Sequence, residues 1–178
     1  MRTSSREAIL SAALRVVDVE GGEELTYDSV AREAGLTKAG VMYHFPSKED
    51  MMIAVIEHVI TRWQNELLEE LGVPFAESTL EQRVRAFVTF ATGGGVSRGE
   101  FAVFSGAVRR PVLSEPWHRY LREWFSFGES TDTAPLMLAW FAANGVWIAE
   151  STGILQVNPE QRAELLDRMI RLTVGGDR

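Results

Sequence analysis

Residues 27–50 read YDSVAREAGLTKAGVMYHFPSKED, and this stretch decides how the first part of the chain folds. With the preceding Thr26 it forms two short helical patterns, Thr26 to Ala34 and Thr37 to about Phe45, separated by a Gly-Leu turn. Two helices that cross at roughly 90–120° over such a turn need a small residue where they touch, and Ala31 supplies it. Gly35 suits the positive φ of the turn. The stretch therefore predicts a helix-turn-helix.

Hydroxyl side chains stand where the helices of this region begin. Thr26 and Thr37 are placed to cap the helices that they precede, because a side-chain oxygen can accept a hydrogen bond from an amide of the first turn. Ser47 and Asp50 have the spacing of a capping box, at the start of a long helix that reaches about Leu71. The apolar residues expected on the inner faces of the helix pair are Val30, Ala34, Leu36 and Val41.

Apolar residues recur with helical spacing along nearly the whole chain, so the sequence predicts an all-α protein of about nine helices. The first is expected over Arg6–Val19. After the long helix, further helices are predicted at 80–92, about 99–108, 114–127, 133–151 and 159–173. Pro111 is interpreted as a break between two of them. No stretch alternates with period two for long enough to predict a sheet.

Composition limits the classes of function. The chain has 178 residues, no cysteine and a net charge of −7. The absence of cysteine excludes disulfides, thiolate metal sites and cysteine nucleophiles, and it suits a cytoplasmic protein. The acidity gives no support to a nonspecific nucleic-acid binder, so phosphate contacts must come from a few well-placed cations and backbone amides. The longest apolar stretch, 134–149, is shorter than the roughly 20 residues of a spanning helix, so no membrane partner is expected.

Residues 35–50, GLTKAGVMYHFPSKED, closely resemble the signature of the tetracycline-repressor (TetR) family. The resemblance is specific from about Arg6 to Val59, and beyond it the chain matches only in length and helical pattern. It implies a helix-turn-helix DNA-binding domain over residues 1–47 and a ligand-binding and dimerisation domain over 48–178. The implied function is a transcription regulator, a repressor that leaves a palindromic DNA operator when a mostly apolar small molecule binds it.

The resemblance also assigns DNA contacts residue by residue. The implied DNA-binding residues are Thr26, Tyr27, Thr37, Lys38, Ala39, Gly40, Tyr43, His44 and Lys48. Thr37 begins the recognition helix, whose first residues enter the major groove. Lys38 and Tyr43 are the expected base readers, because Ala39 and Gly40 are too small to read base edges by hydrogen bonds. Lys48 matches a lysine that pairs with phosphate, helped by the helix dipole.

Alternatives stay open for these positions. His44 could bond within the domain instead of contacting the DNA backbone, and Lys48 could be a solvated charge. Many family members have an aromatic residue where this chain has Met42, so one backbone contact is expected to be missing.

Two helices near the end of the chain predict a homodimer. The helix 133–151 is apolar on nearly every side, and the helix 159–173 carries more apolar surface than a terminal helix needs. Meeting their symmetry mates, they would form an isologous four-helix interface. Two recognition helices would then read half-sites about 34–36 Å apart, or a multiple of that spacing. The alternative is a monomer that buries both helices within itself.

Aromatic residues predict the site of the small molecule. The candidates are Trp63, Phe87, Phe90, Phe104, Trp117, Trp124, Trp140 and Asn144. Ligand cavities are mostly apolar with a few polar groups, although rings at helical spacing are more often core than pocket. Asn144 lies in the middle of an apolar helix, where it must find a partner in a neighbouring side chain or a ligand. Cationic lipophilic, lipid-like and neutral aromatic ligands all suit this composition.

Neither a catalytic site nor a metal or cofactor site is predicted. The histidines His44, His58 and His118 occupy three different segments, and no serine lies in a nucleophile-elbow motif. His118 with Glu115, one helical turn earlier, provides too few ligands for a metal sensor. The alternative function is a ligand-binding dimer whose DNA-reading domain no longer recognises DNA, and the net acidity keeps that alternative open.

Overall fold

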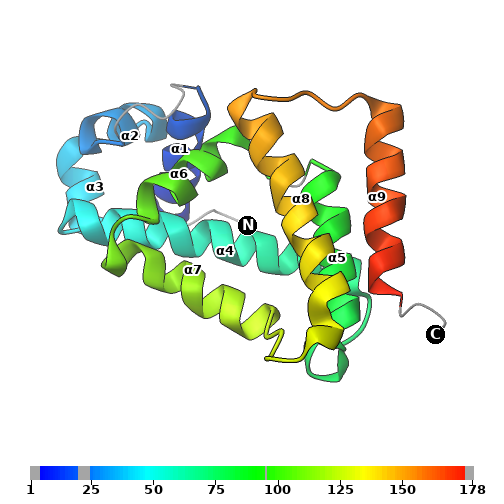
Figure 1. Ribbon diagram of the computed structural model, residues 1–178. Helices are drawn as coiled ribbons and strands as arrows, with labels where there is room; N and C mark the ends of the chain where they lie inside the picture. The colour runs from blue at the N-terminus through cyan, green and yellow to red at the C-terminus, as the bar shows by residue number, and fades with distance from the viewer. Residues whose placement is uncertain (1–4, 20–24, 95, 175–178) are drawn as a thin grey trace. The chain divides into compact units, whose positions relative to one another are not determined.

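A computed structural model describes residues 5–19, 25–94 and 96–174, and Figure 1 shows its helices. Within these residues the chain forms nine α-helices, two short 3-10 helices and no strand, which confirms the all-α prediction. The α-helices are α1 (Ser5–Val19), α2 (Tyr27–Ala34), α3 (Lys38–His44), α4 (Lys48–Leu71), α5 (Leu80–Thr92), α6 (Arg98–Ala107), α7 (Pro111–Trp124), α8 (Ala134–Thr152) and α9 (Pro159–Thr173). The 3-10 helices are η1 (Phe75–Glu77) and η2 (Thr131–Thr133). Over the described ranges, no helix is long and apolar enough to cross a membrane.

The chain divides into two compact units. Unit 1 consists of residues 1–61 and 97–119, and unit 2 of residues 62–96 and 120–178. Unit 1 therefore holds α1, α2, α3 and α6, and unit 2 holds α5, α8 and α9, while α4 and α7 contribute residues to both. The domain boundary expected between residues 47 and 48 stays a prediction.

In unit 1, α1 packs against both α2 and α6, and α2 packs against α3. The fully buried residues that join the first three helices include Ile9, Val30 and Val41. The inward position predicted for Leu36 is wrong, because its side chain is 39% exposed. Leu36 belongs to the turn and not to either helix, and its amide donates to the carbonyl of Ala31 at 2.9 Å. It therefore shares neither inner face.

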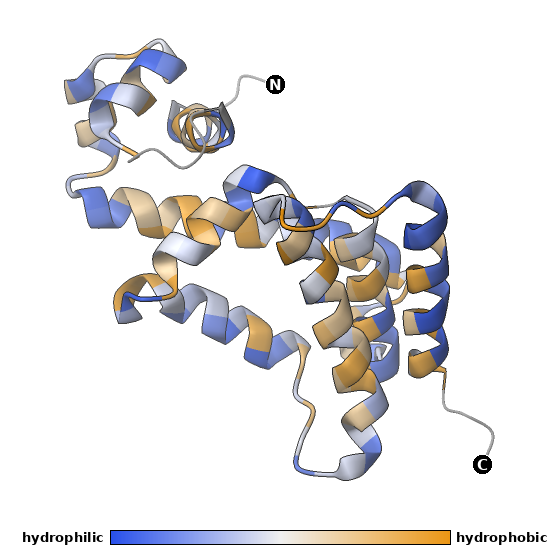
Figure 2. Cartoon of the chain, turned by 45° about the horizontal axis from the view of Figure 1, so that its top comes forward, coloured by the Kyte–Doolittle hydropathy of each residue, from blue (hydrophilic) through white to orange (hydrophobic). Residues whose placement is uncertain are grey.

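In unit 2, α5, α8 and α9 lie side by side (Figure 1), with contacts between every pair. Arg162 of α9 joins the other two helices: its Nη1 donates to the carbonyl of Thr92 at 2.7 Å, and its guanidinium pairs with Glu150 of α8. Arg85 of α5 donates to Thr173 Oγ1 at 3.1 Å near the end of α9. Figure 2 shows α9 as mostly polar along its outer side, whereas Met169 is buried and Leu165 is exposed.

The structure corrects the bounds predicted for α7. The expected range was 114–127, but the helix begins at Pro111 and ends at Trp124. Proline suits a first helical position, because its fixed φ is helical and its missing N–H would have no partner there. Residues 125–127 then lead into a turn in which Gly128 has a φ of 66°. The bounds predicted for the neighbouring helices agree to within about one residue.

Candidate DNA-binding surface and ligand site

Threonine caps hold the starts of α2 and α3, as predicted. Thr26 Oγ1 accepts from the Ser29 amide at 3.1 Å, and Ser29 Oγ accepts from the Thr26 amide at the same distance. Thr37 Oγ1 accepts from the Gly40 amide at 3.1 Å. Between the helices, Gly35 takes the left-handed conformation with a φ of 67°. The helix-turn-helix geometry expected from the spacing is therefore present.

The Tyr27 hydroxyl closes the helix-turn-helix from within. It donates to the carbonyl of Phe45 at 2.8 Å, which ties the first residue of α2 to the residue that ends α3. Phosphate oxygens only accept hydrogen bonds, so this hydroxyl cannot donate to DNA while it donates to Phe45. In this structure Tyr27 is a positioning residue, and its DNA contact stays a prediction.

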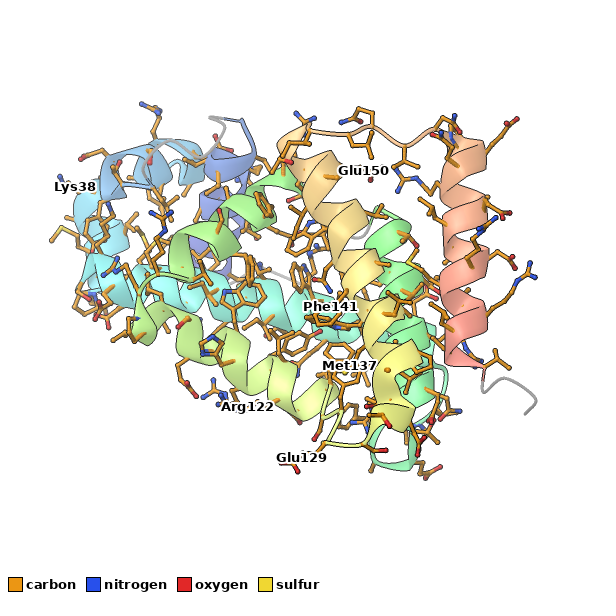
Figure 3. All side chains as sticks on the ribbon, viewed as in Figure 1. Lys38, Arg122, Glu129, Met137, Phe141 and Glu150 are labelled. Atoms are coloured by element: carbon orange, nitrogen blue, oxygen red, sulfur yellow. The ribbon has the colours of Figure 1, made fainter. Side chains whose placement is uncertain are left out.

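The recognition helix α3 has one buried and one exposed side. Val41 is fully buried, whereas Ala39 is exposed and Tyr43 is 84% exposed. Lys38 lies on the outer edge of the α2–α3 pair (Figure 3). His44, half-buried, meets the Tyr43 ring edge to face at 5.4 Å. The expected base readers therefore both lie on the exposed side, whereas their contacts with DNA stay predictions.

The start of α4 is fixed by the predicted capping box. The Ser47 amide donates to Asp50 Oδ2 at 3.0 Å, and the Asp50 amide donates to Ser47 Oγ at 3.0 Å. Lys48, at an exposed position, is the first residue of the helix. The neighbouring Glu49 pairs with Arg110 at 3.0 Å. These contacts hold the helix start that carries Lys48.

A close contact between α1 and α6 was not predicted from the sequence. The Gly99 amide donates to Asp18 Oδ1 at 2.7 Å, so the carboxylate holds the start of α6 against the end of α1. A Cβ on Gly99 would lie 2.3 Å from Asp18 Oδ1 and 2.9 Å from the Asp18 amide nitrogen. Only glycine fits here. No sequence signal identifies it, because the residues are far apart in the chain.

The predicted ligand residues do not all belong to one unit. Phe104 and Trp117 belong to unit 1, where their rings pack edge to face at 5.4 Å. The other six belong to unit 2. There Trp63 packs against Phe90 at 5.8 Å and against Trp147 at 5.6 Å, and all three are buried. These three rings belong to the hydrophobic core, which is the more common role of aromatic rings at helical spacing.

A second group of rings in unit 2 surrounds Trp140. Its indole stacks on the Phe87 ring, with the ring centroids 5.8 Å apart. The centroids of the Phe125, Phe127 and Phe141 rings lie 5.9, 6.3 and 5.4 Å from that of Trp140. These five residues are called the Trp140 cluster below. Phe141 is 56% exposed (labelled in Figure 3), so the cluster reaches the surface of unit 2.

Trp124 and Tyr120 adjoin this cluster on α7. The centroid of the Trp124 ring lies 6.2 Å from that of Phe125, 6.0 Å from that of Tyr120 and 4.9 Å from that of Phe75. Tyr120 was not among the ligand-site residues predicted from the sequence. Its spacing could have identified it, because Trp117, Tyr120 and Trp124 follow the i, i+3, i+7 pattern of one helix face.

Two buried donors in this region have no hydrogen-bond partner within the described residues. They are the Tyr120 hydroxyl and Trp140 Nε1. Burial raises the pKa of Tyr120 well above its ordinary value, so the hydroxyl keeps its proton at neutral pH and remains a donor. Buried donors are nearly always satisfied in native proteins, so this pair needs an explanation.

Asn144 finds a partner that was not expected. Its Nδ2 donates to the main-chain carbonyl of Trp140 at 2.8 Å, one turn earlier in α8. The predicted partner was a neighbouring side chain or a ligand, and a carbonyl of the same helix accepts from Nδ2 because a short amide side chain reaches back by one turn. The contact of Asn144 with a ligand stays a prediction. Among the described residues, no three His, Cys, Asp or Glu side chains come together as a metal site.

Comparison with known families decides the identity. Residues 9–55 match the model of bacterial regulatory proteins of the tetR family. Residues 81–174, more than half of the chain, match the tetracyclin repressor-like C-terminal domain. The chain belongs to the TetR family. The TetR match at the N-terminus covers most of α1, all of α2 and α3 and the start of α4, and the C-terminal match covers nearly all of α5 and α6 to α9.

Individual relatives of this TetR chain are regulators. It is 31% identical over 88 residues to the HTH-type transcriptional regulator BetI of Rhizobium meliloti, covering 49% of the chain and 42% of BetI. It is 36% identical over 61 residues to the HTH-type transcriptional regulator RutR of Escherichia coli, covering 34% of the chain and 29% of RutR. The matched parts thus span less than half the length of either relative.

A solved structure shares the TetR fold along nearly the whole chain. The multidrug binding protein EbrR, complexed with malachite green, superimposes with a TM-score of 0.61 over 94% of this chain and 96% of EbrR. The two sequences are 22% identical, so this likeness concerns the fold alone.

Proposed function

We propose that the protein is a sequence-specific DNA-binding repressor that acts as a homodimer and leaves its operator when a small molecule binds unit 2. The observation that carries the proposal is the helix-turn-helix, capped by Thr26 and Thr37 and closed by Tyr27, with Lys38 and Tyr43 exposed on its recognition helix. This segment lies inside the part of the chain that matches the TetR family.

The acidity of the chain is compatible with this proposal because several acidic groups near the recognition helix are already engaged. Asp28 pairs with Lys38, Glu49 pairs with Arg110, and Asp50 accepts from the Ser47 amide. Specific binding then depends on a few placed cations and polar groups, and the total charge matters less. The alternative of a dimer without DNA recognition loses its main support.

Selection of bound sites from genomic DNA fragments tests the DNA-binding proposal, followed by titrations of wild type and Lys48→Ala at several salt concentrations. We expect a palindromic site. In a dimer the substitution removes two phosphate contacts, one from each chain, so it should weaken binding across all sequences and make the salt slope shallower by about two. Arg122→Ala, which removes an exposed cation from the last turn of α7, is the control and should leave the slope unchanged. Enrichment of no sequence at low salt would reject the proposal.

The exposed apolar residues of α8 and α9 support the dimer. Leu138 on α8 is 57% exposed and Leu165 on α9 is 38% exposed. A groove of about 540 Å³ runs beside Leu165, lined by α9 and by residues 155–157. We propose that α8 and α9 of a second copy cover these surfaces, because burial of apolar area drives association of this kind.

The Trp140 cluster and Tyr120 support a site for the small molecule. Their rings provide apolar contact, and the Tyr120 hydroxyl and Trp140 Nε1 provide two donors. A buried donor without a partner costs about 1–3 kcal/mol, so a ligand that accepts from either donor gains this amount on binding. We therefore propose a mostly apolar, aromatic effector that carries a hydrogen-bond acceptor. EbrR with malachite green is an example of the same fold with an aromatic ligand.

Helix α4 is the proposed link between effector and operator. It begins at Lys48 in unit 1 and continues into unit 2, where it carries Trp63. An effector that binds one position of α4 more tightly than another shifts the protein toward that position, and this difference in affinity sets the change in operator binding.

Tyr120→Phe separates a ligand donor from a structural group. Without its hydroxyl the free protein should be more stable than wild type, because the buried donor without a partner is gone, while affinity for an acceptor-bearing aromatic compound falls about 5- to 160-fold. The measurement is tryptophan fluorescence titration with pairs of aromatic compounds that differ by one carbonyl oxygen. The donor role predicts that only wild type distinguishes the two compounds of a pair. If wild type binds both with equal affinity, as the variant should, the donor role is refuted.

A further inference from the structure

An ion pair joins the starts of the two helices of the helix-turn-helix. Lys38 Nζ lies 2.8 Å from Asp28 Oδ2, and the side chains are 54% and 70% exposed. Lys38 is the first residue of α3, and Asp28 lies in the first turn of α2. Caps at Thr26 and Thr37 fix the backbone below both residues. The carboxylate and the ammonium are therefore held side by side at exposed positions, and Figure 3 shows Lys38 at the outer edge of the α2–α3 pair.

Stability gives little reason for this pair. Exposed ion pairs contribute little to folding, because water screens the charges and two long side chains lose freedom. Near a surface that approaches DNA, the Asp28 carboxylate also repels phosphate. Its position beside an expected base reader is better explained by recognition of a base.

The donor and the acceptor together match a base that presents an amino group in the major groove. Cytosine presents its N4 amino group and adenine its N6 amino group, and their partners present the acceptors guanine O6 and thymine O4. A carboxylate accepts from either amino group, and an ammonium donates to the acceptor of the paired base. Thymine and guanine, by contrast, present O4 and O6, acceptors that repel the carboxylate of Asp28.

We propose that Asp28 is a specificity-determining residue that requires a base with a major-groove amino group, cytosine or adenine, at one position of each half-site, with Lys38 held beside it to contact the acceptor of the paired base. This inference rests on the proposed DNA-binding function. Asp28 is absent from the DNA contacts that the family resemblance implied, and the ion pair with Lys38 is what identifies it.

The test compares wild type, Asp28→Ala and Asp28→Asn on the selected operator and on variants with each base at every half-site position. Wild type should prefer cytosine or adenine over thymine or guanine by about tenfold or more at one position. Both variants should reduce this preference to about twofold, because alanine has no acceptor and the asparagine amide can donate to thymine or guanine as well as accept from cytosine or adenine. The asparagine variant preserves the size of the side chain if the alanine variant folds poorly.

Glu33→Gln is the matched control. Glu33 lies on the same helix, and its carboxylate, in a side chain 42% exposed, pairs with Arg15 at 2.6 Å. This variant changes the charge as Asp28→Asn does and should leave every base preference unaltered. A rise in affinity of Asp28→Ala for all sequences, with unchanged base preferences, would overturn the inference and leave Asp28 as a repulsive charge only. If wild type selects no sequence at all, the DNA-binding proposal itself fails, which is a different result.

Discussion

Replacing Gly99 by alanine should separate α6 from α1. The new Cβ would lie 2.3 Å from Asp18 Oδ1 and 2.9 Å from the Asp18 amide nitrogen. The carboxylate can rotate away, but the backbone nitrogen cannot, so the helices must move apart. This movement also breaks the 2.7 Å hydrogen bond from the Gly99 amide to Asp18.

The size of the effect follows from these contacts. Overpacking costs about 1–3 kcal/mol, and a lost hydrogen bond to a charged group costs about 1.5–3 kcal/mol. The helix propensity of alanine returns at most about 1 kcal/mol. The net loss is about 2–5 kcal/mol, which for a chain of this size lowers Tm by about 5–15 °C.

Thermal unfolding followed by circular dichroism measures this loss, and Gly106→Ala is the control. Gly106 lies on the same helix, and a Cβ there would meet nothing within 4 Å. That substitution should leave Tm unchanged or raise it. In an Asp18→Ala background, Gly99→Ala should cost less, because part of the clash and the hydrogen bond are already gone. Equal Tm values for Gly99→Ala and Gly106→Ala would refute the close contact.

Two further substitutions test the DNA-binding unit and the dimer. Tyr27→Phe removes the hydrogen bond to Phe45 and should lower unfolding free energy by about 0.5–1.5 kcal/mol in urea titrations. The same variant should leave the salt slope of operator binding unchanged, and a shallower slope would instead make Tyr27 a phosphate contact. Leu138→Glu places a charge on the proposed α8 interface and should give monomers in sedimentation experiments, whereas Val112→Glu, at a residue 54% exposed on α7, should remain dimeric. A dimeric Leu138 variant would exclude this interface.

Local features of the fold could be predicted from the sequence because their contacts lie within a few residues. The caps at Thr26 and Thr37 and the box of Ser47 and Asp50 join positions three residues apart, which are visible as spacings. Gly35 belongs to the same class, since its backbone conformation depends on its own turn. Helix bounds based on such signals agree with the structure.

Errors arose where one residue type suits two situations. Pro111 was interpreted as a break between two helices, but it is the first residue of α7. Proline suits the first turn of a helix as well as a loop, so the residue type alone does not decide between the two. Leu36 was expected in the core because it is apolar, but its place in the turn exposes it. Asn144 was expected to bond to another side chain or a ligand, and a carbonyl of its own helix accepts from its Nδ2, while its contact with a ligand stays a prediction.

Contacts distant in sequence could not be predicted. Gly99 is required because α6 meets α1, and Tyr120 matters because its side chain is buried and its hydroxyl has no hydrogen-bond partner among the described residues. The aromatic candidates illustrate the same limit. The sequence identified the aromatic residues, but it did not show which of them pack together. Only packing separates the buried Trp63 from the Trp140 cluster.

The central claim is that two recognition helices of one dimer read two half-sites. Footprinting of wild type on the selected operator, with the mass of the complex measured in parallel, tests it most directly. The account predicts a palindromic footprint whose half-site centres lie about 34–36 Å apart or a multiple of that spacing, with an even number of chains per site. A single unpaired half-site bound by one chain would contradict it.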